Sequence, residues 1–454
     1  MYDLGLDITF VDVVLAIALL VFVVFYFYKH QSTKSNPPYY KYFIYGLFAK
    51  AIAAFVFCCI YAYYYRDGDA IYYFKVSKEL GGLLFNEPLS FLKIILSGQI
   101  TYNDLFELSN QFDWSIYTSD KFTFFFIRLI TPLNILSGGN FISCSVLLAM
   151  ISYTGIWKLY VVFCEQFPLL WKELSIAILF FPSVLFWSSG LLKDTVTISA
   201  LGWFVFGLHR LMNRKINFRY LFYLSLSSFV LISIKPYILH GLIVTTFIWM
   251  AVHYIRRIDL SLERLIFAPA IIGVLLVITF LLVLNIVKDQ GRFDIKKKIE
   301  QNLNYSNRSS SAKSVFSMAP IDNTIPSYIS HSMASVNVTL FKPYFWEANG
   351  IMLLAASFEN FILFIFLLFL LIKFKFIHLC KHIYQNPFLI FSFFFIVVFS
   401  FMIGSTIDNY GTLHRFRIPM MPFYLSLCMI LNGQLSVIKR SEKMALLNDA
   451  KAER

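Results

Sequence analysis

Apolar stretches long enough to cross a lipid bilayer recur along the whole chain, and they limit what it can fold into. A transmembrane helix needs about 20 predominantly apolar residues, and several runs approach or exceed this length. Only 14% of the 454 residues are charged, against about 25% in soluble domains. The 51 Phe and 27 Tyr cannot all be buried in one soluble core, since such cores stop growing at about 250–300 residues. We therefore predict a polytopic membrane protein and exclude both a soluble enzyme and a single-span receptor.

The expected fold is an all-α integral membrane protein with about 11 transmembrane helices, which form a single polytopic domain over residues 1–454. The predicted spans are 8–28, 43–65, 141–163, 174–190, 194–211, 219–234, 236–254, 265–287, 350–372, 387–405 and 416–437. The fourth to sixth of them are short for a membrane span.

The basic residues indicate an orientation. The net charge of +13 comes from short Lys and Arg clusters between apolar runs and not from one contiguous basic face, which argues against a nucleic-acid partner. Such clusters mark cytoplasmic loops. When the amino terminus is placed outside, the clusters around Arg256 and Lys373 and the tail 438–454 all become cytoplasmic. The carboxyl terminus is then inside, and we expect a multi-pass protein of the cell inner (plasma) membrane.

Two long gaps between predicted spans fall on the outer side. The first, 66–140, contains the apolar stretches Phe91–Leu96 and Phe122–Ile135, interrupted by Lys, Arg and Pro, which is typical of amphipathic helices in the membrane interface. The second, 288–349, contains a Ser-rich stretch that we expect to be partly mobile. It ends in the aromatic segment KPYFWE (342–347), a composition favoured at the level of lipid headgroups.

Two carboxylates follow the second predicted span. Asp67 and Asp69 are separated by Gly68 and preceded by Arg66. Such a pair can act as a general base, orient an acceptor hydroxyl, or bind Mg²⁺ or Mn²⁺ through oxygen. The alternative is a solvated helix end in which Gly68 supplies a turn. We predict Asp69 and Asp67 as catalytic residues, with a divalent cation as an open possibility and no other metal site.

Basic residues between short spans are candidate phosphate ligands. Lys193 and Asp194 lie between two apolar runs, where charge is costly unless it is paired or lines a cavity; Asp194 can also cap the following helix. Lys235 precedes Pro236 with no loop, an arrangement that suits either a phosphate or a tight hairpin.

The segment before the last predicted span carries His414, Arg415 and Arg417, against the positive-inside bias. Guanidinium groups match phosphate oxygens bidentately, so these residues are predicted to bind phosphate. The alternative is an ion pair with Asp408 or with the carboxylates at 67 and 69. Lys342 and Glu347 are weaker candidates, because the same residues suit an interface anchor.

All of these clusters fall on the outer face of a topology that was derived without them. Acidic groups beside several basic groups suit a lipid phosphate held next to a general base. Neither a P-loop nor a dinucleotide-binding glycine motif is present in the sequence. An outward-facing site also has no supply of nucleotides, so any donor would have to arrive already attached to a lipid.

The acidic motif in the first long outer loop, the interfacial helices after it and the outer-face site resemble the GT-C class of membrane glycosyltransferases. The segments PSVLFWSSGLLKD (182–194), KPY (235–237), LFKPYFWEANG (340–350), SFEN (357–360) and GTLHRFRIPMMPF (411–423) are also similar to those of bacterial membrane proteins of surface-polysaccharide synthesis. In GT-C enzymes the acidic loop usually follows the first span, whereas here it follows the second. The resemblance implies that Asp67 or Asp69 is the catalytic carboxylate and that the basic groups hold the carrier phosphate.

The leading hypothesis is thus a membrane glycosyltransferase or polysaccharide polymerase that uses a polyprenyl-(di)phosphate-linked donor at the extracytoplasmic face. Its partners would be membrane lipid, the lipid-linked donor and a saccharide or lipid acceptor. The alternatives are a transporter or flippase of lipid-linked saccharides and a non-catalytic scaffold of a surface-assembly system.

Overall fold

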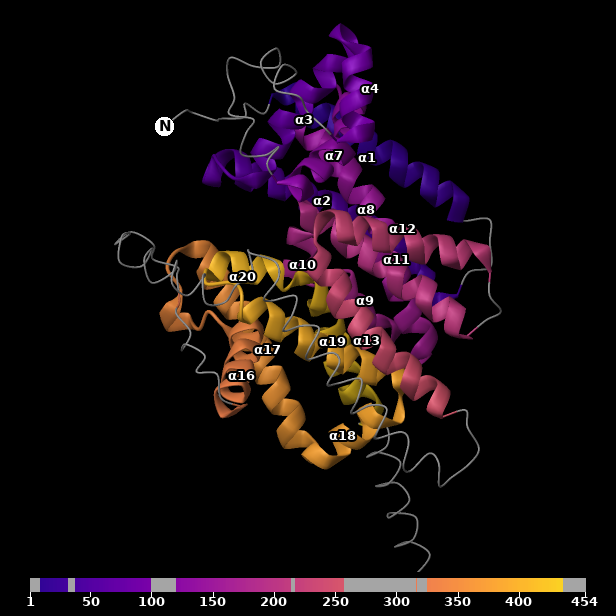
Figure 1. Cartoon of the computed structure of the whole chain (residues 1–454), viewed down its shortest axis with the longest axis vertical. Coiled ribbons are helices and arrows are strands. Elements are labelled where there is room, and N and C mark those ends of the chain that lie inside the picture. The colour runs from indigo at the N-terminus through magenta and orange to yellow at the C-terminus, as the bar shows by residue number, and fades with distance from the viewer. Residues whose placement is uncertain are drawn as a thin grey trace, which may run out of the picture. The chain divides into compact units, whose positions relative to one another are not determined.

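The computed structural model describes residues 9–31, 37–98, 120–213, 217–256, 316 and 325–435, and in these ranges the chain is helical, with no β-strand. Figure 1 shows the arrangement of the helices. The predicted span 265–287, most of the gap 288–349 and the tail 438–454 lie outside the described residues.

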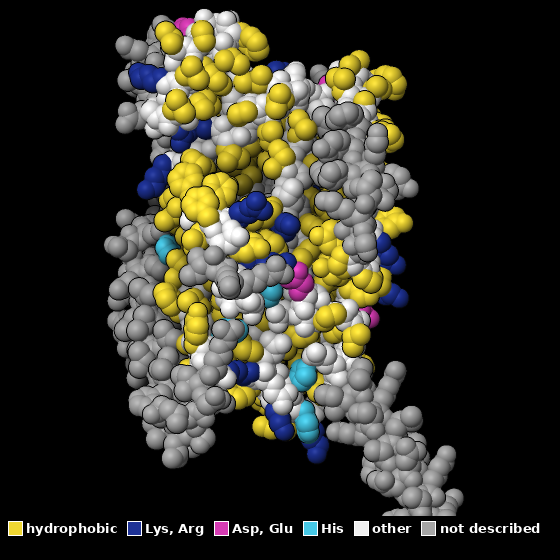
Figure 2. All heavy atoms as spheres, turned by 90° about the vertical axis from the view of Figure 1, so that its right-hand side faces the viewer, with side chains coloured by type: hydrophobic (Ala, Val, Ile, Leu, Met, Phe, Trp, Pro, Cys, Tyr) yellow, Lys and Arg dark blue, Asp and Glu magenta, His cyan; other side chains and the backbone are white. Residues whose placement is uncertain are grey.

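Seven of the described helices are long and apolar enough to cross a membrane, which indicates a membrane-embedded protein. They are Pro38–Tyr65, Phe141–Gln166, Lys193–Asn213, Pro236–Ile255, Ile351–Lys373, Pro387–Gly404 and Tyr410–Leu435. Two more predicted spans are helical, as α1 (Phe10–Gln31) and the 17-residue α12 (Phe218–Ile234). Figure 2 shows hydrophobic side chains over much of one face, with Lys and Arg in small groups. The total of about 11 spans and their orientation stay predictions.

The chain divides into two compact units, Met1–Tyr237 and Ile238–Arg454. In the first unit α8 (Phe141–Gln166) packs against α1, against α2 (Tyr42–Cys59) and against α11 (Lys193–Asn213), and α11 packs against α12.

Glycine residues allow the close backbone contact between α8 and α11. A Cβ added to Gly155 of α8 would collide with the backbone carbonyl of Ser199, and one added to Gly202 of α11 would collide with the carbonyl of Gly155. Small residues bring helix backbones together in this way in membranes.

The first long predicted loop, 66–140, contains three described helices: α3 (Asp69–Asn86), α4 (Pro88–Ser97) and α7 (Lys121–Leu136). Both apolar stretches predicted there are therefore helical. Asn134 of α7 donates to the Phe74 carbonyl at 3.1 Å and to the Ser77 hydroxyl at 2.7 Å, which joins α7 to α3. Arg128 donates to the Ile95 carbonyl of α4 at 3.0 Å. The location of these helices in a membrane interface stays a prediction.

The prediction of one continuous span over 174–190 was wrong. Helix α9 (Trp171–Ile178) ends before α10 (Pro182–Trp187) begins. Proline cannot donate a backbone hydrogen bond and disfavours a helical residue before it, and Phe181 is accordingly extended. The buried Lys50 of α2 donates to the carbonyl and, at 2.7 Å, to the hydroxyl of Ser188, directly after α10. A cation at this position is favourable because a helix carboxyl end has partial negative charge.

The second unit begins at Ile238, within α13 (Pro236–Ile255). Its other described helices are α16 (Ile325–Phe341), α17 (Ile351–Lys373), α18 (Phe376–Gln385), α19 (Pro387–Gly404) and α20 (Tyr410–Phe416). The helical run that starts with α20 continues to Leu435. The last predicted span starts at 416, but the helix begins six residues earlier because Asn409 caps it by accepting from the Gly411 and Thr412 N–H groups. The basic motif 414–417 therefore lies within the helical run and not in a gap before it.

The α8–α11 contact gives a first prediction. Gly155→Ala and Gly202→Ala should each lower the melting temperature of the detergent-purified protein, because the new methyl group meets backbone that cannot rotate away. Gly82→Ala on α3 is the matched control, since a Cβ there would meet nothing within 4 Å and alanine gains about 1 kcal/mol in a helix interior. Equal melting temperatures for all three variants would contradict the close backbone contact.

Candidate functional site

The site residues predicted from the sequence fall in three places: a cluster around Asp194 and the turn Arg66–Asp69 in the first unit, and a cluster around Arg417 in the second. In the first unit, Lys235 and Asp194 form an ion pair of 2.5 Å, with side chains only 5% and 1% exposed. Asp194 lies in the first turn of α11, and Lys235 follows the last residue of α12. Buried charges are tolerated only when paired, so the two ions hold the start of α11 against the end of α12.

The neighbouring Lys193 is engaged elsewhere. Its ammonium group donates to the Thr123 hydroxyl at 2.6 Å and lies 3.6 Å from the carboxylate of Asp120. Asp120 is the N-cap of α7, accepting from the N–H of Phe122 and the hydroxyl of Thr123. The cluster thus ties α11 to α7. Sequence reasoning missed Asp120 and Thr123, although an Asp directly before an apolar run is a recognisable helix start.

The two predicted catalytic carboxylates lie at a tight turn between α2 and α3. The helix that contains α2 continues to Tyr65, and Arg66 follows with a left-handed backbone, φ 54°. Gly68 has φ 118°, a conformation that only glycine adopts readily. Asp67 accepts from the Gly68 N–H at 2.7 Å, and Asp69 is the first residue of α3. Both carboxylates are exposed, so this turn presents them to the outside of the unit.

Tyr72, half-buried on α3, adds a hydroxyl to this turn. Burial raises the pKa of Tyr72, and the charge of Asp67 and its hydrogen bond with the hydroxyl raise it further. The phenol therefore stays protonated at neutral pH and can act as a hydrogen-bond donor beside Asp67.

In the second unit Arg417 is fully buried and bound on several sides. Its guanidinium donates to the Thr339 and Leu340 carbonyls at 3.3 and 3.1 Å, at the end of α16. It also donates to Glu359 at 3.3 Å and to Asn360 at 2.5 Å, both on α17. The ion pair considered for Arg417 thus exists, but its partner is Glu359.

The other predicted residues of this unit lie around the same network. His414 has its Nε2 atom 3.9 Å from the Glu359 carboxylate, and Arg415 is half-buried on α20. The backbone carbonyl of Asp408 accepts from the N–H of Phe316 at 2.9 Å. Glu359 was missed, although a carboxylate inside the apolar run 350–372 is by itself a sign of a specific partner.

Lys342 and Glu347 form an ion pair of 2.6 Å in the connection between α16 and α17. Burial alone raises the pKa of Glu347, but hydrogen bonds from Lys342, the Tyr344 N–H and Tyr410 together outweigh it and lower the pKa. Asn360 donates to the Pro343 carbonyl at 3.4 Å. The segments KPYFWE, SFEN and HRFR, far apart in sequence, therefore meet through direct hydrogen bonds.

Within the described ranges no group of three or more His, Cys, Asp and Glu side chains is placed to hold a metal ion. Magnesium takes oxygen ligands and is usually bound by one or two carboxylates together with substrate phosphates. Asp67 and Asp69 could supply the carboxylates, and the phosphate would have to come from the substrate. No protein-family description, curated protein or solved structure matches this chain.

The buried pair in the first unit gives a second prediction. Lys235→Met and Asp194→Leu should each lower the free energy of unfolding by about 3–5 kcal/mol, because each removes the ionic partner of a buried charge. The double variant should recover most of this loss, since an apolar pair needs no partner. Denaturant titrations of the purified protein measure the difference. Additive losses in the double variant would mean that the two side chains are not coupled.

Arg417 and its neighbour Arg415 give a third prediction. Arg417→Met should lower the melting temperature strongly, because the carbonyls of α16 and the Glu359 carboxylate would lose their donor. Arg415→Met is the matched control on the same helix, and its half-buried side chain should make the loss much smaller. A larger loss for Arg415→Met would show that Arg417 does not hold this network.

Proposed function

We propose that the protein is a multi-pass glycosyltransferase or polysaccharide polymerase of the inner membrane, which transfers a sugar from a polyprenyl-(di)phosphate-linked donor at the extracytoplasmic face. The amino terminus would lie outside and the carboxyl terminus inside. The observation that carries the proposal is the turn at Arg66–Asp69, which presents two exposed carboxylates at the end of a candidate span.

The ion pairs of four other acidic residues support this choice. Asp194, Asp120, Glu347 and Glu359 lie within 4 Å of a Lys or Arg nitrogen. Each helps to join two segments of chain. Among the described residues, Asp67 accepts hydrogen bonds from groups of its own turn and of α3, and no Lys or Arg forms an ion pair with it. A base needs such access to an acceptor hydroxyl.

In the proposed reaction, Asp69 or Asp67 takes the proton of the acceptor hydroxyl while the acceptor oxygen attacks the anomeric carbon. The bond from that carbon to the carrier phosphate breaks, and the phosphate oxygen keeps the electron pair. Positive charge lowers the energy of this leaving group. Arg66, exposed beside the carboxylates, is the first candidate for this role.

Lys193 is the second candidate, because its ammonium group lies 5.9 Å from the ring centroid of Tyr73, one turn beyond Asp69 on α3. Lys235 and Arg417, by contrast, are enclosed with their partners and would have to leave them in order to bind phosphate. His414 and Arg415 remain candidate phosphate ligands of the second unit.

A fourth prediction tests the base. Protein reconstituted in liposomes with a lipid-linked saccharide extract should release free polyprenyl phosphate or diphosphate, measured by mass spectrometry. Asp69→Asn or Asp67→Asn should reduce release by about 10²–10⁴-fold, the usual contribution of a general base. Glu87→Gln, which neutralises an exposed carboxylate at the start of α4, should leave release unchanged. Full release by both Asn variants would remove the assigned base.

The broken segment α9–α10 favours a transporter or flippase as the second candidate function, because discontinuous helices often form transporter sites. That reading predicts transbilayer movement of the intact lipid-linked saccharide without release of its carrier. A non-catalytic scaffold would give neither movement nor release. It needs no base, so Asp67→Asn and Asp69→Asn would leave its role intact.

A further inference from the structure

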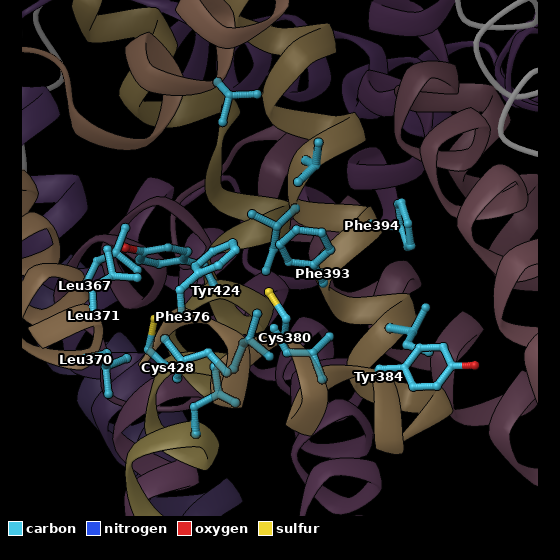
Figure 3. A pocket seen from close by; sticks show the side chains of 18 of the residues that line it. Leu367, Leu370, Leu371, Phe376, Cys380, Tyr384, Phe393, Phe394, Tyr424 and Cys428 are labelled. Atoms are coloured by element: carbon cyan, nitrogen blue, oxygen red, sulfur yellow. The ribbon is translucent and has the colours of Figure 1, made fainter. Parts of the chain in front are cut away.

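A mostly apolar cavity of about 520 Å³ lies in the second compact unit and is open on one side, where its lining residues Phe376 and Tyr384 are exposed. It is lined by side chains of α13, α16, α17, α18, α19 and the final helical run. Figure 3 shows the side chains of α17, α18, α19 and this final run converging on it. Its size falls in the range of about 300–1,000 Å³ that is usual for ligand pockets.

The composition of the wall restricts what can occupy the cavity. Apart from the hydroxyl groups of Tyr384 and Tyr424, the side chains that face it are hydrocarbon or carry the sulfur of Cys380 and Cys428. A stable water needs two to four polar partners, and cavities without them stay dry. A sugar or a free phosphate would likewise lose its hydrogen bonds. The wall therefore favours a hydrocarbon chain.

Helix α18 separates this cavity from a basic surface. Phe376, Leu379, Cys380 and Ile383 line the cavity, and their spacing of three and four residues places them on one face of the helix. The exposed side chains Lys375, His378 and Lys381 alternate with them. This pattern, apolar on one side and basic on the other, is typical of a helix in the plane of a membrane surface.

The surroundings of α18 are positive. Lys375 is adjacent in sequence to Phe376, and Lys381 to Cys380, so each exposed lysine is next to a residue of the cavity wall. Arg256 binds the backbone carbonyls of Tyr384 and Gln385 at the other end of the helix. The sequence contains no Asp or Glu from residue 360 to residue 407. This stretch therefore brings positive charge to the edge of the cavity and no carboxylate of its own.

We propose that the cavity holds one acyl chain of an anionic membrane phospholipid, with the lipid phosphate at Lys375 and Lys381. The apolar wall would take the chain, and the lysines that border it would take the headgroup: Lys375 lies four residues before Leu379 and Lys381 three residues before Tyr384, both of the cavity wall. A zwitterionic phospholipid would satisfy the wall but not the charge. This proposal does not depend on sugar transfer, because it uses none of the charged residues of the Arg66–Asp69 turn or of the clusters around Asp194 and Arg417.

The test is native mass spectrometry of the purified full-length chain in micelles that contain phosphatidylglycerol and phosphatidylcholine in equal amounts. Wild type should retain one phosphatidylglycerol with about tenfold preference over phosphatidylcholine, given the attraction of surface lysines for anionic lipid. The double variant Lys375→Gln/Lys381→Gln should retain either lipid equally. Cys380→Trp, which places an indole in the cavity, should lose retention of both lipids.

Two further variants make the result decisive. Ile362→Trp, on the exposed surface of α17 and outside the cavity wall, should bind lipid as wild type does. Leu427→Trp fills the cavity from the final helix and replaces Cys380→Trp if that variant does not fold. Equal retention of the two lipids by wild type, or retention by a correctly folded cavity-filling variant, would overturn the proposal.

Discussion

The cost of placing charge away from water organises both compact units. An isolated ion loses its hydration there, and only a close partner or a well-oriented backbone group offsets the loss. Lys235 and Asp194, the guanidinium of Arg417 and the ammonium group of Lys50 are all held in this way. In each case the contact joins two helices, so the polar groups that look most functional in the sequence also hold the helices together.

This constraint explains which parts of the fold could be predicted from sequence. Long apolar runs became long helices because the hydrocarbon region leaves backbone groups no alternative to internal hydrogen bonds. The prediction of one span over 174–190 was wrong because hydropathy does not include the effect of Pro182 on the backbone of the residue before it. The start of the last helix was misplaced because Asn409, its cap, looked like an ordinary loop residue.

The residues of the candidate site were chosen from the sequence by type, and their partners could not be predicted. Asp194 and Lys235 were both selected, but their pairing across 41 positions cannot be read from spacing. Arg417 was selected as a phosphate ligand, while Glu359 and Asn360 went unassigned because they lie inside an apolar run. The turn at Gly68 was expected from the sequence as part of the alternative, a solvated helix end, and the catalytic role of its two Asp residues stays a proposal.

The glycines at the α8–α11 contact also restrict motion. Backbone meets backbone at Gly155 and Gly202, so sliding one helix by a turn, about 5.4 Å, would bring bulkier residues into a gap with no room for a side chain. The contact therefore opposes sliding of one helix along the other. Any conformational cycle of the first unit must occur around this pair, at junctions such as the non-helical link between α9 and α10.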